Sequence, residues 1–485
     1  MRTPTVVIIG AGFSGAMTAV QLMRRARTPL RIVLVNKSGR MARGLAYGTR
    51  SPFHLLNVPA GNMSALPDSP NDFVEFCRWA DPDVAPHSFV PRMLYGAYLE
   101  ALLSRTESEG NGRAHTVLEH LTGEVLDLER VETDTSSNVR LTLDAGRQLE
   151  CDTVVLAFGH FLPRDILPRA ALDAFGNRYV ADPWVREPLQ GIPRHADVLL
   201  VGSGLTALDV TISLNRLGHT GRITCVSRRG LMPRGHRVGG APATGRLDGA
   251  SLAAAMGTTL RRQLRTLRTA MAQASARGED WRDVIGALRP HTPALWRALD
   301  FADRRRFLRH VRPYWDVLRH RCAPEALQLL EELQRAGRFD TLAGRIRTAR
   351  VAADDGRPEL TINLRGPGEP CTRRFDFVIN CTGPGSDLTR SAIPLLEQLL
   401  QQGRLKPDPL GLGLAVDDCY AVLNGDGTPQ PWLRYIGPML KARDWEAVAV
   451  PKLRVHAQRL AAELLGSFES GLGVLQHDAG KLVFA

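Results

Sequence analysis

The stretch Thr5–Gly15 reads TVVIIGAGFSG and decides the fold. Val6 to Ile9 form a short apolar run, which is typical of a strand buried on both faces of a parallel sheet. Gly10, Gly12 and Gly15 follow at once in the spacing G-x-G-x-x-G. A strand, a tight glycine turn and a helix N-terminus in this order predict a dinucleotide-binding loop that holds a pyrophosphate.

A helix and a second strand are expected to complete this βαβ unit. Ala16 to Arg25 carry apolar residues at helical spacing, and Arg31 to Val35 form the next apolar run. Asn36 then stands 21 residues after the last glycine, where such sites usually place Asp or Glu to accept from a ribose hydroxyl. Its amide oxygen can still accept, without a charge. Because Lys37 follows, the site could also admit a phosphorylated ribose.

The opening pattern recurs as GSGLTA, a G-x-G-x-x-A motif that begins at Gly202 and Gly204. Twenty residues after its alanine, the second strand ends in Ser227, Arg228 and Arg229 instead of an acid. An acid there would repel a 2′-phosphate, whereas arginine binds one through two parallel donors. The second site is therefore expected to take NADPH rather than NADH. The alternative is an exposed basic turn without a ligand.

The chain contains two copies of one plan, in which a strand-rich segment and a buried strand ending in glycine follow each motif. The closing strands lie in Asp152 to Gly159 and in Asp376 to Gly383. Two dinucleotide motifs in one chain imply two nucleotides, and the economical pair is FAD plus NADPH. We expect an α/β fold with two Rossmann-like domains and a helical insertion: FAD-binding residues 1–190 and 385–485, NADPH-binding residues 191–384, and an insertion over about 250–336.

The insertion is expected to contain three helices, Ser251 to Ala276, Asp303 to His320 with a kink at Pro313, and Pro324 to Arg335. The middle helix is dense in arginine and histidine beside aromatic residues. One interpretation is a solvated basic face. The other is that some of these groups hold carboxylates, which makes Arg309, Arg319, His320 and Arg321 candidate substrate-binding residues.

Composition excludes several classes of protein. The net charge is +12, but only five of the 62 basic residues are lysine and the arginines are spread along the chain, unlike a nucleic-acid-binding patch. No apolar run is long enough for a membrane helix. The seven cysteines are scattered without a C-x-x-C pair, which predicts a reducing, cytoplasmic setting, no metal site and no redox-active disulfide. Because the chain enters a strand directly, no signal peptide is expected.

Several motifs together resemble a known group of proteins. They are GLAYG, HLLNVPAGNMS, GLTALD, LRHRCAP, INCTGP and YIGPMLKARDWEAVAVPKLR. As a set they look like the bacterial FAD/NAD(P)-binding proteins of the two-dinucleotide-binding-domain flavoprotein group, related to flavin-dependent amine N-hydroxylating monooxygenases. The resemblance implies that FAD binds at the N-terminal site. It also implies that Tyr47, Asn57, Met63 and Ser64 border the flavin, and that Gly437 and Trp445 complete the flavin pocket.

The resemblance implies an NADPH-dependent FAD monooxygenase that oxygenates a small substrate through a flavin C4a-hydroperoxide. N-hydroxylation of an amine or acidic amino acid is the expected reaction, with O₂ as co-substrate and no catalytic side chain identified. The fingerprint of Baeyer–Villiger enzymes, F-x-G-x-x-x-H-x-x-x-W, is not matched between Phe158 and Trp184. The alternatives are an NADPH oxidoreductase without oxygen insertion and a non-catalytic nucleotide-binding protein. No nucleic acid or membrane partner is expected, and a homo-oligomer stays open.

Overall fold

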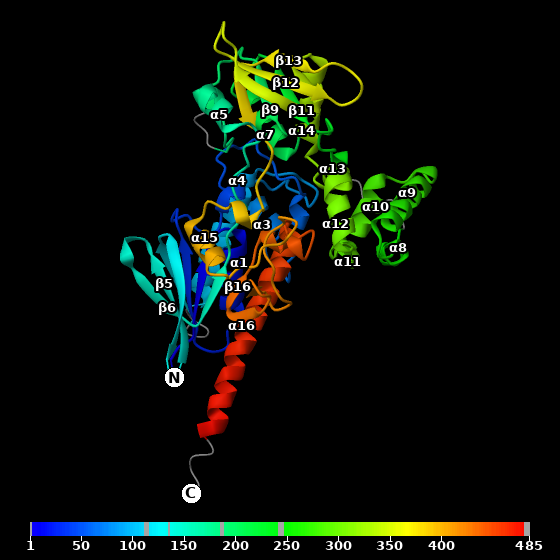
Figure 1. Cartoon of the computed structure of the whole chain (residues 1–485). Coiled ribbons are helices and arrows are strands. Elements are labelled where there is room, and N and C mark those ends of the chain that lie inside the picture. The colour runs from blue at the N-terminus through cyan, green and yellow to red at the C-terminus, as the bar shows by residue number, and fades with distance from the viewer. Residues whose placement is uncertain (1, 111–115, 134–135, 185–188, 241–246, 480–485) are drawn as a thin grey trace.

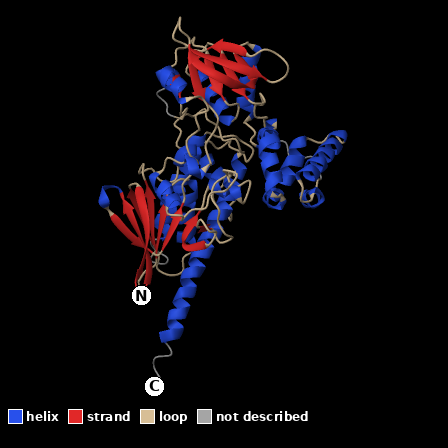
Figure 2. Ribbon diagram, viewed as in Figure 1, coloured by secondary structure: helices blue, strands red, loops and turns tan. Residues whose placement is uncertain are grey.

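The structure is a computed structural model that describes residues 2–110, 116–133, 136–184, 189–240 and 247–479. Two layered α/β bodies lie one above the other, and a group of helices projects from one side (Figure 1). Figure 2 shows a sheet in each body with helices around it and the long helix α16 (Val450–Ala479) running toward the C-terminus. This is the α/β, two-sheet arrangement that the motifs predict.

The opening strand β1 (Thr5–Ile9) lies inside the first sheet, whose order is β15-β16-β7-β1-β2-β3. Val6, Val7 and Ile8 have no exposed surface because helices or strands cover both faces of the sheet. All neighbouring strands are parallel except the pair β15 and β16. The other strands are β2 (Arg31–Asn36), β3 (Val117–Thr122), β7 (Thr153–Leu156), β15 (Ala421–Leu423) and β16 (Pro429–Tyr435).

Helices cover one face of the first sheet. A small antiparallel sheet contacts the first sheet and α15. α1 (Phe13–Arg25) packs between α4 (Arg92–Gly110) and α16, and its residues Phe13 to Met23 are all buried. The small sheet has the order β4-β5-β6. The remaining elements are α2 (Gly44–Tyr47), α3 (Asp72–Ala80), α15 (Pro394–Gln401), β4 (Val125–Thr133), β5 (Ser136–Leu143) and β6 (Gln148–Cys151).

The second sheet repeats the plan of the first, with the order β13-β12-β11-β10-β9-β14-β8. In each sheet the first glycine of the motif donates to the end of the next strand, Gly10 to Val35 O at 2.9 Å and Gly202 to Val226 O at 2.8 Å. The internal repeat is therefore confirmed. The strands are β8 (Tyr179–Val180), β9 (Val198–Val201), β10 (Ile223–Ser227), β11 (Phe339–Val351), β12 (Pro358–Leu364), β13 (Cys371–Arg374) and β14 (Phe377–Asn380).

The chain crosses between the two bodies at Phe161 and Gly385. These residues pair as an antiparallel bridge in which each N–H donates to the other's carbonyl at 3.1 Å. The helix α5 (Arg169–Phe175) and β8 already pack with the second sheet, so the first crossing comes before residue 190, where the sequence placed it. The short strand β8 has no recognisable apolar run, which is why sequence alone misplaced it.

The helical insertion differs from expectation at both ends. The stretch Ser251 to Ala276 is broken at Gly257, whose φ is +64°. Helix α14 (Pro324–Arg335) packs on α7 (Leu205–Arg216) in the core of the second body and not in the insertion. The insertion consists of α8 (Gly249–Met256), α9 (Leu260–Ala276), α10 (Trp281–Leu288), α11 (Thr292–Ala298), α12 (Phe301–Arg306) and α13 (Arg312–Arg319).

A π-helical turn, Phe307–Val311, joins α12 to α13. It lies just before Pro313, whose ring nitrogen has no proton to donate to the α-helical ladder. The helix predicted over Asp303 to His320 is therefore interrupted by a π-helical turn just before this proline. Figure 1 shows α13 between the other helices of the insertion and the second body.

Candidate functional site: two glycine loops and the cleft between them

The first glycine loop lies at the carboxyl end of β1. A side chain on Gly15 would begin 1.9 Å from Gly10 O, and one on Gly10, whose φ is +106°, would begin 2.7 Å from Ala157 O. The fold itself therefore requires these two glycines. Gly12 is different, because a Cβ there would only meet Gly44 Cα at 3.6 Å. The protein leaves space over Gly12, and this is the position at which a pyrophosphate needs bare backbone.

The helix N-terminus at this loop fits a dinucleotide. α1 begins directly after Gly12, and its first turn contains no acidic residue that would repel a phosphate. The first N–H groups of a helix have no partner within the helix and carry the positive end of its dipole. Gly44 faces Gly12 across this space with φ +56°, so both walls are backbone. The donors and the space suit the pyrophosphate of FAD.

Asn36 ends β2 beside this loop, as predicted for a ribose-binding residue. Its amide nitrogen donates to Ser38 Oγ at 3.0 Å and to Arg40 O at 2.6 Å, which holds the turn. This orientation leaves the amide oxygen as the acceptor available to a ribose hydroxyl. Lys37 forms an ion pair with Glu124 at 2.7 Å, so its charge is already balanced.

The loop predicted to border the flavin divides into two parts. Tyr47 is half-buried with its ring edge-on to Tyr95 at 4.6 Å, and Asn57 is half-buried beside the second body. Met63 and Ser64, however, are packed inside the first body with 3% and 0% of their surface exposed. A ligand cannot reach these two side chains, so the prediction that they contact the flavin is wrong.

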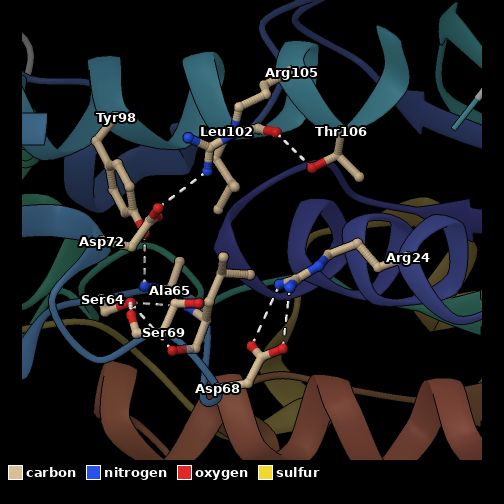
Figure 3. A network of polar contacts seen from close by, with 11 residues as sticks. Arg24, Ser64, Ala65, Asp68, Ser69, Asp72, Tyr98, Leu102, Arg105 and Thr106 are labelled. Carbon is tan, nitrogen blue, oxygen red and sulfur yellow. Dashed lines mark hydrogen bonds and ion pairs between the residues drawn. The ribbon is translucent and has the colours of Figure 1, made fainter. Parts of the chain in front are cut away.

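A polar network accounts for the burial of Ser64 (Figure 3). Its hydroxyl donates to Ser69 O at 2.6 Å, and the next residue, Ala65, donates to the hydroxyl of Tyr98 at 3.1 Å. That hydroxyl in turn donates to Asp72 at 2.6 Å. Ser64 therefore closes the loop on itself, and Ala65 ties the loop to α4 and α3 through Tyr98 and Asp72.

The C-terminal segment after β16 contributes Gly437 to the first site but not Trp445. Gly437 has φ +145° and lies against Phe158 O at the end of β7, next to the first glycine loop. Trp445 instead packs on the insertion, with ring centroids 4.7 Å from Trp296 and 5.1 Å from Phe307. The prediction that Trp445 completes the flavin pocket is therefore wrong, because its indole joins the core of the insertion.

The second glycine loop has the same steric requirements as the first. A Cβ on Gly202, whose φ is +115°, would begin 2.3 Å from Cys381 O, so the fold requires this glycine. A Cβ on Gly204 would meet no atom within 4 Å. Ala207 takes the place of the third glycine and is fully buried between α7 and the sheet. The open position over Gly204 suits a second pyrophosphate.

The rim of the second loop is strongly basic. Ser227 accepts from Ser203 Oγ at 2.7 Å and from the Gly230 N–H at 3.0 Å, which shapes the turn. Arg228 is exposed, and burial together with nearby Arg345 lowers the pKa of its guanidinium. Further basic neighbours are Arg312 and Arg229. Such a cluster is electrostatically suited to a phosphate dianion.

The insertion also reaches this rim. Arg229 lies 5.0 Å from the ring centroid of Tyr314 and donates to its hydroxyl at 3.2 Å. Sequence reasoning missed Tyr314, Arg312 and Arg345 because they come from α13 and β11, far along the chain. Ser227 on β10 pairs with Ala343 on the parallel strand β11, and this pairing brings Arg345 close to Arg228.

The four candidate substrate-binding residues occupy different environments. Arg309 is exposed on the π-helical turn, and His320 is half-buried at the end of α13. Burial, followed by the charge of Arg319, lowers the pKa of His320 to about 3, so the ring is neutral at neutral pH. Arg319 is 5% exposed and paired with Glu446 at 2.5 Å. Arg319 therefore fastens the insertion to the C-terminal segment and is not free for substrate, which corrects the prediction.

Two basic groups that the sequence analysis did not select have strongly lowered pKa values. His160 follows β7 and is solvent-exposed, yet surrounding protein and Lys441 lower its pKa to about 4. Burial and Arg312 lower the pKa of Lys441 to about 8. A polar cleft between the bodies is lined by Asn62 and His87 on one side and by His236, Arg237 and Arg321 on the other.

Two polar contacts hold the bodies together beside the cleft. Arg92 on α4 pairs with Asp209 on α7 at 2.9 Å, and His54 Nε2 lies 2.7 Å from Ser213 Oγ. In the described residues no group of three histidine, cysteine or acidic side chains could hold a metal ion. None of the helices in the described ranges is long and apolar enough to cross a membrane.

Comparison with known proteins agrees with this geometry. Residues 7–161 match a family model described as FAD-NAD(P)-binding, which confirms the interpretation of the opening motif. An uncharacterized protein of Mycobacterium bovis is 23% identical over 527 aligned positions that cover 96% of each chain. A second uncharacterized relative, from Mycobacterium tuberculosis, has the same identity and coverage.

Solved structures share the fold over nearly the whole chain. Ornithine hydroxylase of Pseudomonas aeruginosa, in its reduced form, has a TM-score of 0.63 at 16% identity, covering 96% of this chain and 99% of its own. A cadaverine monooxygenase of Erwinia amylovora has a TM-score of 0.61 at 14% identity, covering 96% and 95%. A bacillithiol disulfide reductase of Staphylococcus aureus has 0.54 at 12%, covering 96% and 99%. The chain thus has the fold of the two-dinucleotide-binding-domain flavoproteins, as its motifs predicted.

Proposed function

We propose that the protein is an NADPH-dependent FAD monooxygenase that N-hydroxylates a small amine. The observation that carries the proposal is the pair of open glycine positions, Gly12 and Gly204, each beside a helix N-terminus. Two such positions accommodate two dinucleotides, and the fold is shared with two amine hydroxylases over almost the whole chain. When bound, NADPH supplies hydride to the flavin, and the reduced flavin activates O₂.

The rims of the two loops support the assignment of the cofactors. Asn36 offers an uncharged acceptor at the first loop, where the neighbouring lysine is paired with an acid. The second loop presents Arg228 and Arg229, with Arg345 nearby. A 2′-phosphate is the part of NADPH that such a cluster can bind and that NADH and FAD lack.

The protein's own residues would position the cofactors and keep water out of the cleft. Gly437 and Phe158 bring the C-terminal segment against the first loop. Arg319 and Glu446 hold the insertion over that segment through a buried ion pair. Shielding the reacting flavin from water is what an oxygenase requires, because water promotes wasteful release of peroxide.

Disulfide chemistry is the alternative raised by the similarity to a bacillithiol disulfide reductase. All seven cysteines lie in the described ranges and none forms a disulfide. Burial raises the pKa of Cys322, to about 11, and of Cys77 and Cys151, each to about 12. The pKa values of Cys225 and Cys381, which lie nearest the second loop, are raised as well. A thiol held in this way is a poor nucleophile, which favours oxygenation.

The substrate is proposed to be an amine with an anionic group, such as an amino acid. The cleft and its surroundings are rich in arginine, and a carboxylate that enters a desolvated site must be paired. The amine has to be neutral to react as a nucleophile, so activity is expected to rise toward alkaline pH until the amine is deprotonated.

The proposal is tested by following NADPH oxidation and peroxide release while amines and amino acids are added to the FAD-loaded protein. A true substrate raises the first rate, suppresses the second and yields a hydroxylamine. NADPH oxidation with full peroxide release for every compound would favour an oxidoreductase without oxygen insertion. Absence of NADPH oxidation in protein that has bound FAD would contradict the proposal.

A further inference from the structure

An apolar cavity of about 70 Å³ lies inside the helical insertion. Residues of α8, α9, α10, α11, α13 and the π-helical turn surround it, together with Trp445 from the C-terminal segment. Its lining is almost entirely apolar. In another protein, an engineered apolar cavity of about 150 Å³ stays dry and binds benzene or xenon. At about half that volume, the cavity of the insertion suits a ligand smaller than an aromatic ring.

Aromatic rings form a rigid part of the cavity wall. The ring centroid of Trp296 lies 4.7 Å from that of Trp445 and 5.8 Å from that of Phe307. Phe307 and Trp445 also meet, with ring centroids 5.1 Å apart. Trp315 completes this part of the wall and is buried. Rings that already touch one another cannot all move inward, so the cavity keeps its volume.

The polar side chains of the wall offer little to a water molecule. The Gln263 amide nitrogen donates to Leu295 O at 3.1 Å, and the Thr292 hydroxyl donates to Arg289 O at 2.9 Å. The Nε1–H of Trp315 is buried, and within the described residues it has no acceptor. A buried water needs about two to four polar partners. A wall with one unused donor is better matched by an apolar molecule that is a weak acceptor.

The C-terminal segment connects this cavity with the first glycine loop. The indole of Trp445 lines the cavity, and Lys441 Nζ lies 4.6 Å from its ring centroid. Burial, followed by the charge of Lys441, lowers the pKa of His160, which comes after β7 beside the first loop. Lys441 and His160 are therefore neighbours. Gly437, in the same segment, lies against Phe158 O at the end of β7. Trp445 thus joins the cavity to the region of the first loop.

We propose that the cavity of the insertion is a binding site for O₂. The proposal rests on the proposed function, because it takes O₂ to be the co-substrate. O₂ is small and apolar, so leaving water for an apolar cavity is favourable, and it can accept a weak contact from the Trp315 Nε1–H. Leu264 and Leu295 belong to the wall and are half-buried, so the cavity is not sealed from solvent. O₂ bound there is held beside the segment that borders the first loop.

Xenon is the probe for this site, because it is small, apolar and visible in a crystal by its electron density. Crystals of the FAD-loaded protein are pressurised with xenon, and a xenon site is expected among Trp296, Trp315 and Trp445. Leu295→Phe should fill the cavity and abolish this site, whereas Leu264→Ala should enlarge the cavity and raise the xenon occupancy. Absence of xenon from the wild-type cavity, or the same occupancy in all three proteins, would overturn the proposal.

Reoxidation of the reduced flavin is the second readout. The FAD-loaded protein is reduced by NADPH without oxygen and then mixed with buffers of low O₂ content. O₂ is about as large as one or two methylene groups, whose burial favours a site about four- to fifteenfold. Leu295→Phe should slow reoxidation at low O₂ by a factor in this range, while FAD content and anaerobic reduction stay unchanged. Reoxidation at the wild-type rate would show that the cavity does not supply O₂.

Leu400→Phe is the matched control. Leu400 is half-buried against the core of the first body, so its enlargement brings a similar packing strain outside the insertion. Neither the xenon site nor the reoxidation rate should change in this variant. If it slows reoxidation as much as Leu295→Phe does, strain is the cause and the proposal fails. If NADPH does not reduce the flavin of the wild-type protein, the proposed function fails instead, and the xenon crystals still decide whether the cavity binds a small apolar molecule.

Discussion

The two glycine loops share one backbone and differ in their rims. Gly10 and Gly202 have φ values of +106° and +115°, and each would place a Cβ against a carbonyl of the neighbouring strand. The residues that surround the two loops differ. The first rim offers the amide of Asn36, whereas the second gathers Arg228 with other arginines of two further elements. The sheet thus places the pyrophosphate, and the residues after the second strand select the nucleotide.

The largest expected effect separates the glycines required by the fold from those required by the ligand. Gly12→Val should abolish FAD binding and Gly204→Val should abolish NADPH binding, because only the nucleotide needs the space above them. Thermal unfolding of both apoproteins should stay close to that of the wild type. Retention of FAD by the Gly12 variant would place the flavin elsewhere.

Gly15→Val is the matched contrast. Its Cβ would lie 1.9 Å from Gly10 O, so the first body should fail to fold or unfold far more easily. If this variant were as stable as the Gly12 variant, the distinction between the two kinds of glycine would be lost.

The next effect concerns the insertion, which touches the second rim. Glu446→Gln leaves Arg319 buried without its counter-charge, and breaking a buried ion pair costs about 3–5 kcal/mol. Urea unfolding should show this loss. FAD affinity should change little, because the pair does not touch the first loop. An unchanged free energy of unfolding would mean that the ion pair does not hold the insertion in place.

A smaller effect tests the second rim directly. Arg228→Ala combined with Arg229→Ala should raise the Michaelis constant for NADPH about ten- to a hundredfold, since charge-assisted hydrogen bonds to the 2′-phosphate are lost. The constant for NADH should change little. Lys37→Ala, at the first rim, is the control and should affect neither coenzyme. An equal response of both coenzymes would show that these arginines do not bind the 2′-phosphate.

A pH dependence of the free energy of unfolding is also expected from three histidines with lowered pKa values. The pKa values of His160 and His236 are lowered to about 4, and that of His320 to about 3. Unfolded histidines take up protons below a pH of about 6.5, whereas these folded ones do not. The free energy of unfolding should therefore be unaffected by these groups above that pH and should fall as the pH drops toward 4. A flat pH profile in urea unfolding would contradict the lowered pKa values of these three rings.

Local sequence patterns were sufficient to predict the backbone of both glycine loops. Within each site the glycine motif and the residues that end the next strand, Asn36 or Arg228 and Arg229, lie within about thirty residues of each other, so sequence alone predicted them. Contacts between residues far apart in the sequence could not be predicted. Arg319 lies in a basic stretch that suggests a ligand, but its partner Glu446 is 127 residues away.

The same limit explains the other errors and omissions. Ser64 sits in a polar loop, yet α3 and α4 bury it. Trp445 follows the strand nearest the first loop, yet it packs on the insertion. Arg345 reaches the second rim only because β11 pairs with β10 across a long stretch of chain. In each case the deciding contact joins elements that no local pattern relates.

The central claim is that FAD at the first loop receives hydride from NADPH at the second. Anaerobic mixing of the FAD-loaded protein with NADPH or NADH, followed by flavin absorbance, tests this directly. NADPH should bleach the flavin much faster than NADH, and the Arg228→Ala, Arg229→Ala variant should remove that preference without loss of bound FAD. Equal rates with both coenzymes in the wild type, or no bleaching by NADPH, would contradict the claim.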